Sequence, residues 1–269
     1  MRTVLSLLLA VGPGACSFVD LQDVPATPQR PTLSSDTATT AKGTLEIEAG
    51  VAVDPTDAFD SPLQLKVGAA EATELFLAWS PYRWVERSGP DGRGQGNLFI
   101  GVRNRFLEET ESRPSAAFQL QTKIPTASER EGLGSGALDF LGAGIVTKDL
   151  GGFLTTGFYQ IGILGEPDGG DTDLEHDVAI ASGTPLVNGL GAFAEVAGTF
   201  IRERDTSSVF TTLGLAYAIA RDVVADAGVV VGLSDDAPDF RVVAGVTINF
   251  GHLFPGERGA ASGASARAR

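Results

Sequence analysis

Charged side chains recur inside otherwise apolar or small-residue segments of this 269-residue sequence. These residues could do chemistry, because a charge in a confined interior either pairs with an opposite charge or contacts a passing solute. Their signs nearly balance, so the sequence leaves two interpretations open: ion pairs that brace an interior, or the lining of a narrow polar constriction. The set comprises Glu46, Glu48, Glu74, Asp139, Glu195 and Asp226 with Lys66, Arg103, Arg105, Lys123 and Arg241.

One pair in this set falls on neighbouring segments. Asp226 and Arg241 flank a single connection, and if they lie at similar distances from it they form a cross-strand ion pair. Glu195, two segments away, would extend this pair into a network across the interior. We therefore predict an Asp226–Arg241 pair.

Enzymatic chemistry has few candidate residues. His176 and His252 are the two histidines, which excludes a multi-histidine metal site. His176 and Ser182 are the obvious Ser/His pair, but six residues of strand separate them by about 20 Å, too far for proton transfer. The stretch "GLGSG" lacks the Lys-Ser/Thr of a phosphate-binding loop. We predict no enzymatic activity, no metal and no cofactor.

The charged residues lie in segments that alternate apolar residues with small or polar ones, the pattern of β-strands. The last segment, "FRVVAGVTINF", would place Phe240, Val242 and Phe250 on one face and Arg241 on the other. Most segments have nine to fourteen residues, whereas soluble strands usually have five or six and tilted membrane strands about nine to eleven. The predicted strands are 44–53, 62–70, 73–81, 95–106, 114–124, 136–147, 152–163, 175–183, 189–202, 208–219, 222–233 and 239–250.

The connections between these strands alternate in length. "AEAT", "KDLGG", "TPLVNG" and "ARD" are short, whereas "PYRWVERSGPDGRGQ", "IPTASEREGLGSG" and "EPDGGDTDLEH" are long. "EETESRPS" is the exception, because it falls among the short connections and is longer than they are. Outer-membrane barrels have short periplasmic turns and long external loops. We predict an all-β fold, a closed antiparallel transmembrane β-barrel of twelve strands over residues 43–254.

The two faces of the strands support a membrane setting. One face is steadily apolar, and the other is rich in glycine with single charges in mid-strand, as expected for a narrow lumen. A soluble β-protein would show the same alternation, but usually with a dense Lys, Glu and Thr face toward water. The formal charge of −14 argues against a nucleic-acid partner. The predicted surroundings are the lipids of a Gram-negative outer membrane.

The two ends of the chain read differently from the barrel. Residues 1–17, "MRTVLSLLLAVGPGACS", have the form of a secretory signal peptide. Cys16 stands where a lipoprotein is acylated, but Pro13 occupies a position that usually carries leucine, so lipidation and ordinary cleavage both remain open. Residues 18–42 are rich in Pro, Thr and Ser, which predicts a flexible linker ahead of the folded part. Residues 255–269 are predicted to be a disordered tail.

The barrel region resembles the outer-membrane transporter family associated with the meta-pathway of phenol degradation. The residues that carry the resemblance are "LQLKVGAAEATELFLAW", "LFIGVRNRF", "QTKIPTAS" and the closing "DAGVVVGLSDDAPDFRVVAGVTINF". The resemblance implies a small outer-membrane barrel associated with uptake of hydrophobic or aromatic compounds. The chain departs from the pattern at its end, because such barrels often finish on the last strand's aromatic residue and this chain continues beyond Phe250.

These observations predict a channel for passive uptake of small solutes, hydrophobic or aromatic ones among them, through a narrow charged lumen. An alternative is a sealed structural or adhesive surface barrel whose acidic external loops carry the function. A third interpretation is an outer-membrane lipase.

Overall fold

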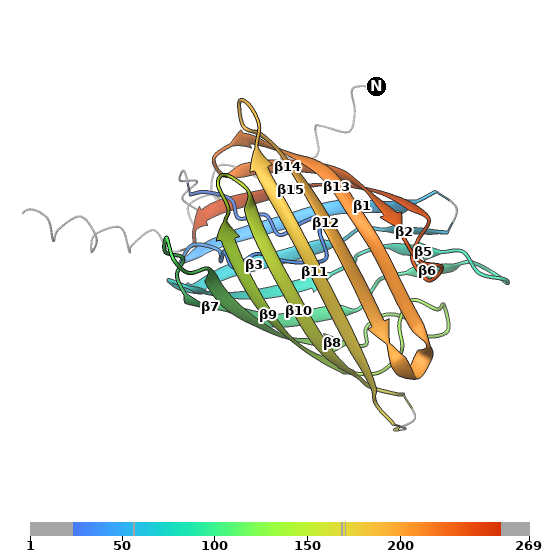
Figure 1. Cartoon of the computed structure of the whole chain (residues 1–269). Coiled ribbons are helices and arrows are strands. Elements are labelled where there is room, and N and C mark those ends of the chain that lie inside the picture. The colour runs from blue at the N-terminus through green and yellow to red at the C-terminus, as the bar shows by residue number, and fades with distance from the viewer. Residues whose placement is uncertain (1–23, 56, 168, 170, 254–269) are drawn as a thin grey trace, which may run out of the picture.

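A single antiparallel sheet closes on itself to form a barrel (Figure 1). The computed structural model describes residues 24–55, 57–167, 169 and 171–253. Closure follows from the pairing of the last strand with the first, because Ile47 lies opposite Ile248 and Val53 lies opposite Val242. The signal peptide, Cys16 and the tail 255–269 that the sequence predicts lie outside the described residues.

Twelve of the strands form the wall, which confirms the predicted fold class. Their bounds are β1 (Thr44–Asp54), β3 (Leu63–Ala70), β4 (Thr73–Trp79), β7 (Leu98–Leu107), β8 (Ser115–Ile124), β9 (Asp139–Asp149), β10 (Leu154–Leu164), β11 (Asp173–Pro185), β12 (Leu190–Ile201), β13 (Thr206–Ala220), β14 (Val223–Gly232) and β15 (Phe240–His252). Three short strands, β2 (Ala58–Asp60), β5 (Arg83–Val85) and β6 (Gly92–Gly94), extend the sheet from the end of β1. The predicted strand over 136–147 begins later, at Asp139, because Gly136 adopts a positive φ of 74° that belongs to a turn.

The connections separate the barrel into two ends. The turns β3–β4, β9–β10, β11–β12 and β13–β14 are short and lie at one end, together with the longer β7–β8 turn over 108–114. The connections at the other end include 80–97, 125–138 and 165–172, and β2, β5 and β6 lie there too. By the rule for outer-membrane barrels, the short-turn end is periplasmic and the long-loop end external.

The outer surface of the wall is apolar. On β13, for example, Leu213, Leu215 and Tyr217 are about half exposed, while Thr212, the residue before Leu213, is buried. A closed barrel pairs its backbone groups between strands, so its wall can stand in hydrocarbon without unsatisfied N–H or C=O groups. The closed wall and its apolar outer surface place the protein in an outer membrane.

Helical structure is confined to one short 3-10 turn, Arg202–Arg204, within the part of the chain that the structure describes. None of the described helices is long and apolar enough to cross a bilayer.

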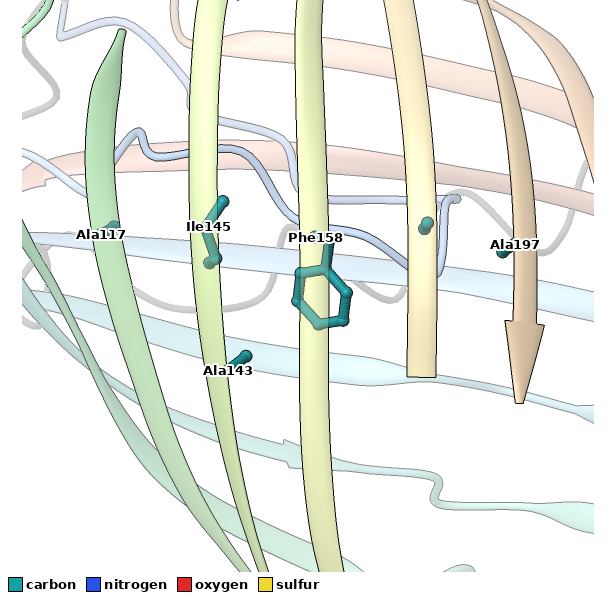
Figure 2. Close-up of a cluster of buried hydrophobic side chains, with 6 residues drawn as sticks. Ala117, Ala143, Ile145, Phe158 and Ala197 are labelled. Atoms are coloured by element: carbon teal, nitrogen blue, oxygen red, sulfur yellow. The ribbon is translucent and has the colours of Figure 1, made fainter. Parts of the chain in front are cut away.

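The inner face of the wall is not uniformly polar. Small apolar side chains and one aromatic ring gather on consecutive strands from β8 to β12, and Figure 2 shows the ring of Phe158 beside its neighbours on the adjacent strands. This inner apolar cluster comprises Ala117, Ala143, Ile145, Phe158, Ala179 and Ala197, all at most 7% exposed. The sequence analysis predicted small residues here but did not anticipate that they would form one continuous apolar strip on one side of the lumen.

The segment ahead of β1 lies inside the barrel and not ahead of it. We expected residues 18–42 to be a flexible linker, but the described part, 24–42, runs inside the ring of strands (Figure 1). It makes hydrogen bonds to inward side chains of the wall. The composition was misleading because proline prevents regular secondary structure in a segment without preventing its burial. We call residues 24–42 the inner segment.

The lipid-facing surface yields a test on β13. Replacing Leu213, near the middle of the strand, with arginine should destabilise the barrel by about 2–4 kcal/mol, the cost of a basic side chain at the bilayer midplane. Ser207→Arg, on the same face at the external end of β13, should cost about 0–1 kcal/mol. Urea unfolding of the two variants in lipid vesicles measures the difference, and equal losses would contradict the assigned membrane position.

Candidate functional site

The inner segment enters and leaves the barrel at its periplasmic end. The Ala26 N–H donates to the carbonyl of Arg221, which lies in the short β13–β14 turn, at 3.0 Å. At its other end the segment runs into β1, where the Thr44 N–H donates to the carbonyl of Ala41 at 3.0 Å. Between these points the chain rises into the lumen and returns, so the segment occupies the periplasmic half of the barrel.

The inner segment forms no regular strand except a single bridge at Lys42, because its sequence discourages one. Pro25, Pro28 and Pro31 lack N–H donors and cannot take part in a β-ladder at those positions. The remaining backbone groups therefore need partners from elsewhere, and buried backbone groups in folded proteins are almost always paired. The inward charged side chains of the wall provide many of those partners.

Glu195 holds the segment at its deepest part. Its carboxylate accepts hydrogen bonds from the backbone N–H groups of Leu33 and Ser34, both at 2.8 Å, and from the Ser34 hydroxyl at 2.5 Å. Glu195 is 1% exposed. The ion pairs of the described residues give it no lysine or arginine partner. The inner segment therefore supplies the hydrogen bonds that stabilise this buried negative charge.

Glu74 plays the same part near the periplasmic end. It accepts hydrogen bonds from the Thr40 N–H at 2.8 Å and from the Thr40 hydroxyl at 3.1 Å. Glu74 also lies 3.4 Å from the guanidinium of Arg103, which in turn donates to the carbonyl of Ala38 at 3.4 Å. Wall and segment thus share one network on this side of the lumen.

Lys66 lies between two carboxylates on β1. Its ammonium is 2.5 Å from Glu46 and forms a second, shorter ion pair with Glu48. All three side chains are fully buried. Each carboxylate also accepts from the inner segment, Glu46 from the Thr27 N–H at 2.8 Å and Glu48 from the Gln29 N–H at 3.0 Å.

Arg30 is the cation of the inner segment that lies deepest in the lumen. Its guanidinium lies 4.0 Å from Asp226 and donates to the carbonyl of Ala244 at 3.2 Å. It lies against two glycines that face each other in register on β1 and β15, Gly50 and Gly245. A Cβ at Gly50 would be 2.1 Å from Arg30 Nη1. One at Gly245 would be 2.9 Å from Arg30 Cζ and 2.7 Å from the carbonyl oxygen of Ala49. We call Gly50 and Gly245 the glycine notch.

The other predicted inward charges lie farther from the segment's tip. Lys123 and Asp139 form an ion pair toward the external end, where Lys123 also donates to the Ser135 hydroxyl at 2.7 Å. Arg105 reaches the carbonyl of Thr37 at 3.5 Å and pairs with Glu108 at 2.9 Å. Nine of the eleven predicted residues are buried; Arg105 and Arg241 are intermediate.

The predicted Asp226–Arg241 pair is wrong. Arg241 lies opposite Val230, while Asp226 lies opposite Gly245, so the two charges are four residues apart along the sheet, about 13 Å at about 3.3 Å per residue. The error came from assuming equal distances from the β14–β15 connection. Asp226 faces Arg30 of the inner segment instead, and Glu195 bonds to the same segment.

One inward carboxylate was missed by the sequence analysis. Asp177 on β11 is buried and accepts hydrogen bonds from Gln160 and Thr199, both at 2.6 Å. The alternation in "DLEHDVAIASG" places it in phase with inward positions, so the signal was present. It was overlooked although it lies within the predicted strand 175–183, because the inward phase of that strand was not assigned.

The two residues of the enzymatic alternative stay apart. His176 Nδ1 lies 2.9 Å from the hydroxyl of Tyr159, and both residues are on the outer face of the wall. The Ser182 hydroxyl is instead 3.1 Å from that of Thr155. Among the described residues, no group of three or more His, Cys, Asp or Glu side chains is arranged to hold a metal ion.

Two cavities lie against the inner segment and share Arg30 in their lining. One, of about 360 Å³, lies toward the periplasmic end beside Gly183, Pro185 and Phe193. The other, of about 180 Å³, lies toward the external end beside Ala78 and Asn97. The residue that occupies the glycine notch therefore lies between the periplasmic and external spaces.

The fold is that of outer-membrane β-barrels. A solved outer-membrane channel from Pseudomonas putida F1 superposes with a TM-score of 0.65 and 11% identity, over 81% of this chain and 100% of the other. The KdgM and NanC porins superpose with TM-scores of 0.54 and 0.53, each at 9% identity over 76% of this chain and 98% of theirs. No family model and no curated protein sequence matches the chain. The resemblance to the phenol-pathway family stays a prediction.

The buried Lys66 cluster yields a test of the site. Lys66→Met would leave Glu46 and Glu48 buried without their cation, and breaking a buried pair in this way costs about 3–5 kcal/mol. A triple variant that also carries Glu46→Gln and Glu48→Gln should recover part of that loss, because no uncompensated charge remains. Urea unfolding in lipid vesicles measures all three proteins.

A matched control exists at the periplasmic end. Lys148 lies 3.0 Å from Glu109 and, through its hydrogen bond, lowers the pKa of that exposed carboxyl. Because water screens this pair, Lys148→Met should reduce stability far less than Lys66→Met. If both substitutions had the same small effect, the Lys66 cluster would not be the buried network described above.

Proposed function

We propose that this protein is an outer-membrane channel that passes small solutes by passive diffusion, without a catalytic step. The observation that carries the proposal is the lumen of the closed barrel, which is lined by charged and polar groups and contains cavities on both sides of Arg30. Charged side chains around a narrow passage are a recurring way to control what moves through a pore.

The lining also supports a class of solute. Charged groups line most of the wall, and the inner apolar cluster on β8 to β12 lies on the same strands as Lys123, Asp139 and Asp177. A small solute with one apolar or aromatic part and one polar part would contact both kinds of wall. The solved structures of an outer-membrane channel and of two porins share this fold, which agrees with the proposal.

The alternative of a sealed surface barrel is favoured by one specific observation. The inner segment is held in the periplasmic half by hydrogen bonds that it donates to buried carboxylates such as Glu195 and Glu74. A segment fixed there permanently would close the lumen, and the function would then belong to the external loops. The two candidates differ in one measurable property, which is transport.

Planar bilayer recordings and solute flux into vesicles separate these candidates. The purified full-length protein should produce conductance steps and release or admit small solutes if it is a channel, because the charged lumen then connects the two sides. Vesicles without protein and vesicles that contain the heat-unfolded protein are the controls. A folded protein that reproducibly gave neither conductance nor flux would remove the channel and leave the sealed barrel.

A further inference from the structure

The segment that occupies the lumen is attached unevenly. At Glu195 the hydrogen bonds are short and come from two backbone N–H groups and a hydroxyl. At Asp226 the nearest cation, Arg30, is 4.0 Å away, and neither carboxylate oxygen has a hydrogen-bond partner among the described residues. Arg30 Nε and Nη1 likewise have none. A buried charge that is incompletely paired stabilises a structure poorly, so this attachment is the weak one.

The fit of Arg30 depends on the absence of two side chains. Gly50 and Gly245 face each other on β1 and β15, and the guanidinium fills the space that their Cβ atoms would take. Neither glycine has a positive φ, so the backbone conformation at both positions accepts alanine. At Gly50 the three atoms nearest an added Cβ all belong to Arg30, whereas at Gly245 the Cβ would also be 2.7 Å from the carbonyl oxygen of Ala49 on the neighbouring strand. Gly50 is therefore the position where a side chain would meet the inner segment before it meets the wall.

The wall beneath the segment carries excess negative charge. Five carboxylates and three cations of the wall contact the inner segment, which leaves a net charge of −2: Glu46, Glu48, Glu74, Glu195 and Asp226 against Lys66, Arg103 and Arg105. Lys66 and Arg103 are paired with wall carboxylates. Glu195 and Asp226 take their described partners from the inner segment alone, so they would be the two carboxylates without protein partners if the segment left.

We propose that the inner segment is a displaceable gate whose weakest attachment, Arg30 in the glycine notch, is the first to release, and that the pore it uncovers selects cations through Glu195 and Asp226. This inference rests on the proposed channel function and adds its regulation and the sign of charge that the pore prefers. Release exposes the two carboxylates to the passage, where they attract cations and repel anions. The prolines of the segment favour an extended chain without secondary structure of its own, so leaving the lumen requires no helix or strand to unfold.

The gate is tested by loosening Arg30 in the full-length protein. Arg30→Ala removes the side chain, and Gly50→Ala fills the notch and expels it, because the atoms nearest an added Cβ there all belong to Arg30. Both changes remove contacts made only in the closed state, which shifts the population toward the open state. In planar bilayers each should raise the open fraction several-fold over the unmodified protein. Heat-modifiable mobility on gels shows that each variant has folded.

Gly183→Ala is the matched control. Gly183 also faces the lumen, but a Cβ there would make only ordinary contacts, the nearest at 3.5 Å from the carbonyl of Ala192. It should leave the open fraction unchanged. If the open fraction rose equally in all three variants, the wall as a whole would have been loosened, and the gate would be overturned. If the open fraction rose in none of them while the unmodified protein conducts, the gate would be overturned but the channel function would stand.

Selectivity is tested in the Arg30→Ala background. With a potassium chloride gradient, the reversal potential should show cation preference, and Glu195→Gln or Asp226→Asn should reduce the cation-to-anion permeability ratio several-fold. A preference for anions would overturn the proposed cation selectivity, and so would a cation-to-anion permeability ratio that neither substitution changes. If every folded protein, the Arg30→Ala variant included, gave no conductance, the channel function and this inference would both be overturned.

Discussion

A carboxylate buried inside a barrel needs donors, and the interior of this protein is organised around that requirement. Glu46 and Glu48 obtain a cation from the neighbouring strand in Lys66, whereas Glu195 takes its hydrogen bonds from the inner segment. The price of removing a carboxylate from water is several kcal/mol, so each unpaired one would weaken the fold. The segment and the wall are thus parts of one polar network, and neither can be understood as a separate domain.

The barrel itself could be predicted from the sequence because it depends on local, periodic information. Alternation in stretches such as 240–250 sets strand direction and facing, and connection length sets which end is which. The twelve strands and their closure followed from that pattern. Pairings between charges on different strands could not be predicted in this way, because register depends on where each strand begins. An error of a few residues put Arg241 beside Asp226, although Arg241 lies opposite Val230.

The inner segment was mispredicted for a different physical reason. Its residues have the composition of a solvated linker, and composition reports whether a segment can build its own core, not whether another surface will receive it. The information lies in the wall: Gly50 and Gly245 sit opposite each other in mid-strand, and Glu195 sits on a strand whose neighbours offer it no cation. Such positions indicate that something else fills the space, but the sequence does not name the occupant.

The inner segment has strong and weak attachments to the wall, and the difference between them determines how the segment can leave the lumen. If every attachment resembled the one at Glu195, release of the segment would expose several well-satisfied groups at once, and the barrel would stay sealed. Because Arg30 and Asp226 are 4.0 Å apart and poorly hydrogen-bonded, the segment has one point where little is lost on leaving. That point lies between the two cavities, because Arg30 lines both of them. An uneven attachment of this kind favours opening, because few hydrogen bonds are lost at Arg30 and Asp226 when they separate.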